Sequence, residues 1–199
     1  EEYSPSKLVI RDGITHVGTY AFANCETITG DLSLPNSIES IGCNAFYGCR
    51  GFDGKLTLPD HLKEIADNVF WNCKFTGNLI LPDTVESIGD GAFYGCTGLE
   101  GNLVLPNNLK NIGESAFYEC IGFSGNLILP NSLQMIGKAA FCGCSGFSGD
   151  LILPKGLQRI RESTFQRCDG FAGKIMLPRS VTYIANLAFS QSSGFSAIE

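Results

Sequence analysis

The sequence predicts a solenoid of eight stacked coils. One unit of 24 residues recurs in tandem along nearly the whole 199-residue chain, which is typical of an array whose copies contact their neighbours. The copies share one order of leucines, proline, isoleucine, phenylalanine, cysteine and glycine, although the first lacks the proline and the eighth the cysteine. Only the third is one residue shorter, because no glycine separates Lys74 from Phe75. The copies follow one another directly, so we treat residues 1–199 as one solenoid domain. The repeats start at Lys7, Asp31, Lys55, Asn78, Asn102, Asn126, Asp150 and Lys174.

Each repeat opens with a Leu-x-Leu pair, such as Leu127 and Leu129, which predicts a short strand. Leucines separated by one residue have the period of a strand that buries one face. The proline that follows, Pro130 here, cannot donate a ladder hydrogen bond and ends the strand. An Asp or Asn that opens a repeat indicates a cap or turn, because the calcium-binding nonapeptide pattern is missing. These residues are Asp31, Asn78, Asn102, Asn126 and Asp150.

The rest of the repeat predicts a second strand and a turn. An apolar pair three residues apart, Leu133 and Ile136, indicates a shorter extended segment on the other side of the coil. Ala116, Phe117 and Cys120 then fall at positions i, i+1 and i+4. That spacing places all three on one face of a single helical turn, so we expect a 3₁₀ or short α turn. The closing Gly-Phe-x-Gly segment supplies a turn and one more buried aromatic ring.

The run Leu-Pro-x-Ser/Asn-Leu-x-x-Ile-Gly-x-x-Ala-Phe-x-x-Cys, at 105–120 and 129–144, resembles the repeat of the BspA-like leucine-rich repeat proteins. The resemblance covers residues 7 to about 196. It implies a β-rich leucine-rich-repeat solenoid of the α/β-class horseshoe type, with a parallel β-sheet on the concave side and short second strands and single helical or 3₁₀ turns on the convex side. Proteins of this family are typically secreted or on the cell surface, where they act as adhesins. The family has no fixed ligand-binding motif that could be carried over to this chain.

Composition and charge exclude several classes of protein. No run approaches the roughly 18 apolar residues of a membrane helix, so we expect no membrane span. A net charge of -6 argues against a nucleic-acid partner, because phosphate binding needs clustered Lys and Arg. His16 and His61 occupy non-equivalent positions, so no nucleophile–His–acid constellation is repeated, and no phosphate loop occurs. We expect neither catalysis nor a cofactor.

Charge is unevenly spread between the repeats. The fourth repeat holds four acids and no basic residue, and the seventh carries four basic residues against three acids. We interpret this as a solvated surface that varies between copies. The basic residues of the seventh repeat are Lys155, Arg159, Arg161 and Arg167.

Seven of the nine cysteines form a column, one per repeat, and Ser192 ends it. A zinc site is disfavoured, because there is no Cys-x-x-Cys pair. Disulfides between neighbouring coils would be strained, since the coil spacing of about 4.8 Å exceeds the preferred Cβ separation. The favoured interpretation is a small buried hydrophobic residue in a narrow coil. We expect Cys43 and Cys142, outside the column, to be exposed, with Cys142 the better candidate for a reactive thiol. The column is Cys25, Cys49, Cys73, Cys96, Cys120, Cys144 and Cys168.

Two columns of side chains are candidate binding surfaces. The residue after each core Phe is aromatic in four consecutive repeats. This favours an exposed row of aromatic rings, which we call the ribbon, that could form a protein-binding hot spot or stack on sugar rings. The alternative is a partly buried shell over the turns. The residue between the two strand leucines is apolar from the fourth to the eighth repeat, which favours an exposed apolar stripe that binds protein. The alternative is that these residues occur here only because β-branched side chains suit any strand. The ribbon is Tyr47, Trp71, Tyr94 and Tyr118, and the stripe is Ile80, Val104, Ile128, Ile152 and Met176.

The sequence therefore predicts a non-catalytic, extracellular or cell-surface solenoid that binds a protein partner through its concave sheet. A carbohydrate-binding or cell-envelope scaffold module using the ribbon is the alternative, and a structural spacer for another domain is a third. The chain begins without methionine or signal segment and ends within a repeat-like segment, 194–196, so we expect a mature or trimmed chain with more protein beyond it.

Overall fold

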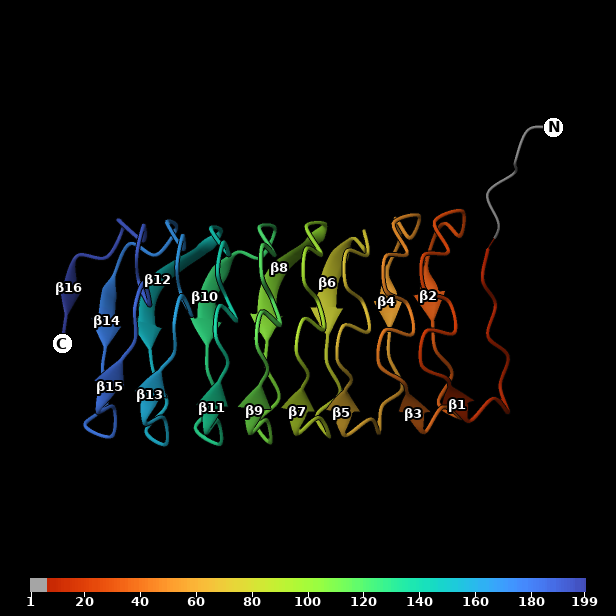
Figure 1. Ribbon diagram of the computed structural model, residues 1–199, viewed down its shortest axis with the longest axis horizontal. Helices are drawn as coiled ribbons and strands as arrows, with labels where there is room; N and C mark the ends of the chain where they lie inside the picture. The colour runs from red at the N-terminus through yellow and green to blue at the C-terminus, as the bar shows by residue number, and fades with distance from the viewer. Residues whose placement is uncertain (1–6) are drawn as a thin grey trace.

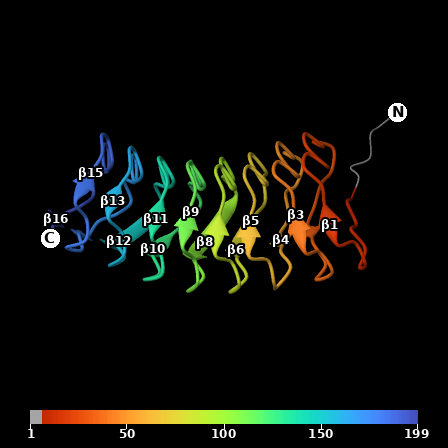
Figure 2. The same cartoon turned by 60° about the horizontal axis from the view of Figure 1, so that its bottom comes forward.

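The computed structural model describes residues 7–199 as a row of coils that follow one another in sequence order (Figure 1). Each complete coil contains two extended segments, and every strand pairing is parallel. Two layers of short strands run along the row, as Figure 2 shows. These features confirm the predicted solenoid with parallel sheets.

The first layer consists of strands that mostly carry the Leu-x-Leu pair of a repeat; we call them the leucine strands, and β16 at the end of the row is counted with them. Leu127 and Leu129 are buried in the coil interior, whereas Ile128 between them is 72% exposed. The predicted alternation of inward and outward side chains is therefore confirmed. The leucine strands are β2 (Leu32–Ser33), β4 (Leu56–Thr57), β6 (Gly77–Ile80), β8 (Leu99–Val104), β10 (Gly125–Ile128), β12 (Phe147–Ile152), β14 (Lys174–Met176) and β16 (Ala197–Ile198).

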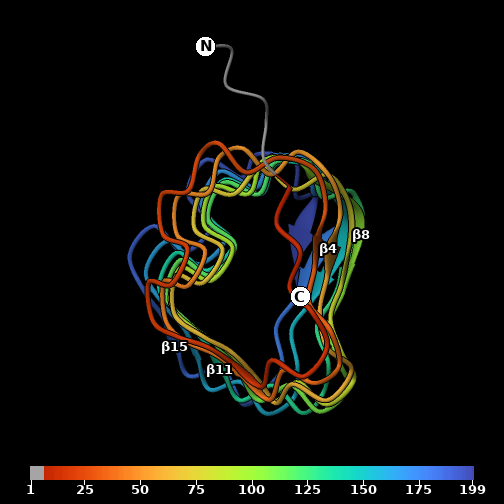
Figure 3. The ribbon, with the colours of Figure 1, turned by 90° about the vertical axis from the view of Figure 1, so that its right-hand side faces the viewer.

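The second layer consists of two-residue strands, most of which end at the isoleucine of the repeat; we call them the isoleucine strands. Viewed along the stack, the leucine strands β4 and β8 lie on one side of the coil and the isoleucine strands β11 and β15 on another (Figure 3). The isoleucine strands are β1 (His16–Val17), β3 (Ser40–Ile41), β5 (Glu64–Ile65), β7 (Ser87–Ile88), β9 (Asn111–Ile112), β11 (Met135–Ile136), β13 (Arg159–Ile160) and β15 (Tyr183–Ile184).

Both layers are interrupted. The leucine strands form a two-stranded sheet, β2–β4, and a six-stranded sheet from β6 to β16. The interruption between β4 and β6 falls at the third repeat, which lacks one residue between its core turn and the next leucine strand. The isoleucine strands form three sheets, β1–β3, β5–β7–β9–β11 and β13–β15.

The segments that carry Ala, Phe and Cys are chains of turns, so the predicted helical or 3₁₀ turns are wrong. No helix occurs in the described part of the chain. The amide of Cys49 donates to the carbonyl of Phe46, three residues earlier, at 3.2 Å, but Gly48 between them has φ +69°, outside the helical region. The amide of Phe46 instead donates to the carbonyl of Val69 in the next coil at 3.0 Å. Bonding between coils thus replaces bonding along a helix.

Two columns of phenylalanine fill the interior. In the first, from Phe22 to Phe189, neighbouring ring centroids lie 5.3 to 5.8 Å apart with nearly parallel planes. Rings of the second column meet the first edge-on, as Phe117 and Phe123 do at 6.0 Å and 72°. Parallel-offset and edge-to-face contacts are the favoured aromatic arrangements, so a spacing near 5 Å suits a stack of rings.

Candidate functional site

The five apolar residues of the stripe face solvent from the six-stranded sheet. They are 40% to 74% exposed. Ile80 is paired with Val104, Val104 with Ile128, Ile128 with Ile152 and Ile152 with Met176, so they lie side by side on successive strands. The same position in the two-stranded sheet is polar and exposed, with Ser33 and Thr57. The apolar stripe therefore coincides with the continuous part of the sheet.

Shallow depressions separate neighbouring members of the apolar stripe. Asn78, Asn102 and Asp83 line the depression between Ile80 and Val104, and asparagines line the next two as well. An apolar ridge bordered by polar side chains is a common form of protein-binding surface.

The aspartates that open the second and seventh repeats bond to the next coil, whereas the sequence predicted a cap or turn at these positions. The Oδ1 atom of Asp31 accepts the backbone N–H of Lys55 at 2.7 Å, and Asp150 does the same for Lys174 at 2.7 Å. A Cβ atom added at Gly101 would lie 2.3 Å from Oδ1 of Asn78, so this glycine makes room for the side chain of the coil before it.

The aromatic ribbon is a stack of half-buried rings. Trp71 and Tyr94 lie 3.7 Å apart at 2°, and Tyr94 and Tyr118 lie 4.6 Å apart at 4°. Tyr47 lies 5.9 Å from Trp71 at 24°. Burial raises the pKa of both Tyr94 and Tyr118. The inner rings use their faces on one another, and Cys142 follows Tyr118 in the same column, so little open ring face remains for a sugar ring.

The cysteine column is a ladder of hydrogen-bond donors as well as a packing column. The Sγ atom of Cys120 lies 3.1 Å from the carbonyl oxygen of Phe93, and Cys144 makes the same contact with Phe117 at 3.0 Å. In the last coil the hydroxyl of Ser192 takes over this role. All nine cysteines are unpaired, and burial raises the pKa of Cys49 to about 11 and of Cys96 to about 12. Such thiols stay protonated at neutral pH and are poor nucleophiles.

The prediction that Cys142 is exposed is wrong. It is only 3% exposed, and burial raises the pKa of its thiol. Cys142 follows Tyr118 in the ribbon column, and the side chain of Gln166 in the next coil lies 3.9 Å from its Sγ atom. Neighbours in the stack therefore cover it. Cys43 is half-buried.

The two histidines lie in different surroundings. His16 contacts the hydroxyl of Thr15 at 2.8 Å and lies 4.0 Å from Glu39, and His61 borders a depression between β3 and β5. Among residues 7–199 no group of three His, Cys, Asp or Glu side chains is placed to hold a metal ion. The same residues contain no helix long and apolar enough to span a bilayer.

Sequence reasoning missed one further column. After each ribbon position a large residue alternates with glycine through the first six repeats, and a Cβ atom at Gly48 would lie 2.3 Å from Oδ1 of Asn24. Arg167 and Glu119, two coils apart, form an ion pair at 3.0 Å, with Gly143 in the coil between them. The glycine at every second repeat is the signal that could have revealed it. The column is Asn24, Gly48, Asn72, Gly95, Glu119, Gly143, Arg167 and Gln191.

Comparison with solved structures supports the fold. The chain is similar to the leucine-rich repeat protein of T. pallidum, with 26% identity over 94% of this chain and 69% of that one and a TM-score of 0.51. It also shares its fold with a leucine-rich cell surface protein of Faecalibacterium prausnitzii A2-165, at 20% identity, 98% and 68% coverage and a TM-score of 0.57. Among curated proteins, none matches this chain.

The sequence itself carries the family signature over most of its length. The BspA-type leucine-rich repeat region matches residues 2–124 and 63–199, which together include every coil. This match agrees with the parallel sheets, the phenylalanine columns and the cysteine ladder. The chain belongs to the BspA-type leucine-rich repeat family.

Proposed function

We propose that this chain is a non-catalytic protein-binding solenoid, the repeat region of a secreted or cell-surface adhesin, and that the apolar stripe is its docking surface. The observation that carries the proposal is the register of Ile80, Val104, Ile128, Ile152 and Met176 along the six-stranded sheet. Full burial of one such side chain is worth about 1.5–3 kcal/mol, so a partner that covers the stripe gains substantial free energy.

The family and one neighbour support the location. Leucine-rich repeat solenoids are extended surfaces suited to binding, and the F. prausnitzii protein is described as a cell surface protein. The partner is a protein of the host or of another microbe. Catalysis is disfavoured because buried column thiols such as Cys96 and Cys120 have raised pKa values, and the two histidines lie in different repeats.

Carbohydrate recognition through the aromatic ribbon is the weaker alternative. Sugar rings bind most strongly over an open aromatic face, and the inner faces of Trp71 and Tyr94 cover each other at 3.7 Å. The part of these half-buried rings that is not covered by a neighbour is what remains for a ligand.

Binding of the purified protein to an array of matrix proteins and glycans tests these alternatives. The variant pair Ile128→Lys with Ile152→Lys should abolish binding to a protein on the array, because two ammonium groups would lose water at an apolar contact. Trp71→Ala with Tyr94→Ala should leave that binding intact. Loss of glycan binding in the aromatic pair alone would favour carbohydrate recognition, and no binding to any component would favour a spacer.

A further inference from the structure

The interruption between β11 and β13 opens a depression in the isoleucine layer, on a different side of the coil from the apolar stripe (Figure 3). In the intact part of this layer, the amide of Gly137 donates to the carbonyl of Ile112 at 2.8 Å, and Gln134 to Lys110 at 2.8 Å. The equivalent amides of the next coil, Arg161 and Gln158, have no such bond.

Arg161 stands at this opening in a position where a side chain meets the preceding coil. Most repeats carry glycine at the position equivalent to Arg161. A Cβ atom added to Gly113 would lie 2.5 Å from a backbone atom of the preceding coil, and one added to Gly137 would lie 2.4 Å from such an atom. A residue with a Cβ atom stands at this position in both interrupted coils, as Ala66 after β5 and Arg161 after β13. The Cβ atom alone does not open the ladder, since the amide of Ala185 still bonds to Ile160 at 2.9 Å.

The opening is local, because bonds on both sides of it hold the two coils together. The amides of Ala139 and Phe141 donate to the seventh coil at 2.9 Å each, and β10 pairs with β12 in the other layer. The depression is therefore too confined for an added strand and suits a small polar group.

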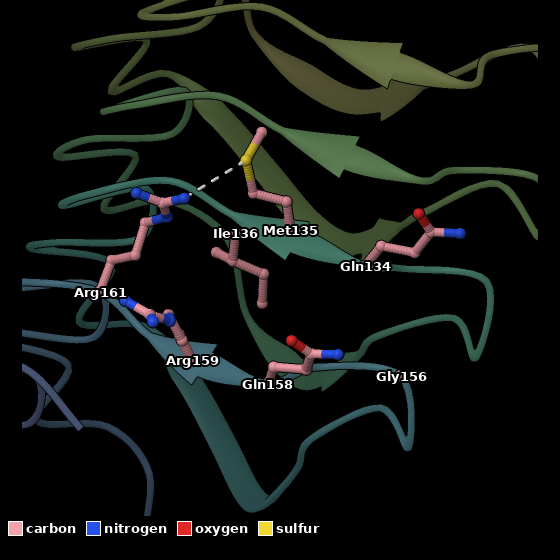
Figure 4. Close-up of a pocket in the computed structure, with 7 residues that line it drawn as sticks. All are labelled: Gln134, Met135, Ile136, Gly156, Gln158, Arg159 and Arg161. Atoms are coloured by element: carbon pink, nitrogen blue, oxygen red, sulfur yellow. Dashed lines mark hydrogen bonds between the residues drawn. The ribbon is translucent and has the colours of Figure 1, made fainter. Parts of the chain in front are cut away.

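Two arginine side chains border the depression without a carboxylate partner. The guanidinium of Arg161 donates to the sulfur of Met135 at 3.7 Å. The guanidinium of Arg159 lies over the ring of Tyr183, 5.6 Å from its centroid. No ion pair within residues 7–199 includes either arginine, and Glu162 beside them is taken by Lys138 at 3.1 Å. Figure 4 shows both arginines at one end of the depression.

We propose that the depression between β11 and β13 binds one oxyanionic group, a carboxylate, sulfate or phosphate, on Arg159, Arg161 and the open amides. Arginine presents a planar fork of N–H donors that matches such a group. The lining contains no acidic residue, so on a chain of net charge -6 this end of the molecule is a local site of attraction for anions. The site lies apart from the apolar stripe and does not depend on its function.

Titration of the protein with sodium sulfate, phosphate and acetate tests the proposal by amide and arginine side-chain NMR, with chloride at equal ionic strength as reference. We expect saturable shifts at the amides of Arg161 and Gln158 and at both guanidinium groups, and the anion that saturates at the lowest concentration identifies the class. Arg159→Gln with Arg161→Gln should weaken binding at least about tenfold. Lys55→Gln with Arg179→Gln removes the same charge elsewhere and should have little effect.

Two further comparisons keep the proposal falsifiable. The depression between β3 and β5 is lined by Glu39, Lys63 and Glu64 and has no arginine, so the amides of Lys63 and Ala66 should not respond. Arg161→Gly should restore the ladder, protect the amide at position 161 from hydrogen exchange and abolish binding. Shifts that rise without saturation, match those at the β3–β5 depression or persist in Arg161→Gly would overturn the proposal.

Discussion

Phe117 is the side chain whose loss tests the packing most simply. It is fully buried and stacks on Phe93 at 5.4 Å and on Phe141 at 5.5 Å. Phe117→Ala should destabilise the protein by roughly 3–5 kcal/mol, the usual cost of emptying a buried aromatic site. Tyr94→Ala should cost clearly less, because its side chain is only half-buried. Chemical denaturation measures both, and equal losses would show that the ribbon belongs to the core.

The cysteine ladder predicts a stability that falls at alkaline pH. Burial raises the pKa of Cys96 from 9.0 to about 12, so between these values the unfolded chain releases a proton that the folded chain retains. The stability that the protonated thiol of Cys96 contributes is fully present below pH 9. It is lost as the pH rises towards the pKa of the folded state, by at most about 1.4 kcal/mol per pH unit.

The variant Cys96→Ser isolates that effect. Serine keeps a donor to the carbonyl of Phe70, as Ser192 does for Phe165, but does not titrate in this range. Its free energy of unfolding, measured by denaturant titration at a series of pH values, should fall less steeply above pH 9 than that of the unchanged protein. Parallel curves would contradict a protonated, buried thiol.

At the scale of single elements, deletion of one coil tests the phase of the repeat. Removing residues 102–125 takes out one 24-residue unit and joins equivalent positions, so the shortened array should fold cooperatively, because coils contact only their neighbours. Removing residues 102–113 would delete the Leu-x-Leu pair and the isoleucine strand of one coil and join Gly101 directly to the turn segment that starts at Glu114. Circular dichroism and denaturation should show a folded protein for the first deletion and a disrupted one for the second; the reverse would refute the assigned phase.

The strands could be predicted from the sequence and the turns could not. The Leu-x-Leu alternation has only one interpretation that buries both leucines, so the inward orientation of Leu127 and outward orientation of Ile128 followed directly. The Ala-Phe-x-x-Cys spacing is compatible both with one face of a helical turn and with a chain of turns. The structure has a chain of turns because residues such as Asn44 have a positive φ, which a helix does not allow. The spacing of apolar residues does not reveal which residues adopt a positive φ.

At the scale of the whole molecule, the repeat predicted the stacking but not its interruptions. The signals were present, in the short third repeat and in the arginine that replaces glycine at Arg161. Their meaning depends on how closely neighbouring coils approach, which only coordinates show. The apolar stripe was predicted correctly as a column, and its coincidence with the unbroken sheet from β6 to β14 came from the structure.

The most direct test of a docking surface on the six-stranded sheet compares two matched lysine pairs on the same layer. Ile128→Lys with Ile152→Lys alters the apolar stripe, and Ser33→Lys with Thr57→Lys makes the same addition at equivalent exposed positions of the two-stranded sheet. Both variants should keep the thermal unfolding of the parent. Affinity for a protein partner found on the array should fall at least about a hundredfold for the first pair and change little for the second. Equal affinities for both pairs, or a loss only in the second, would contradict the assignment of the stripe as the docking surface.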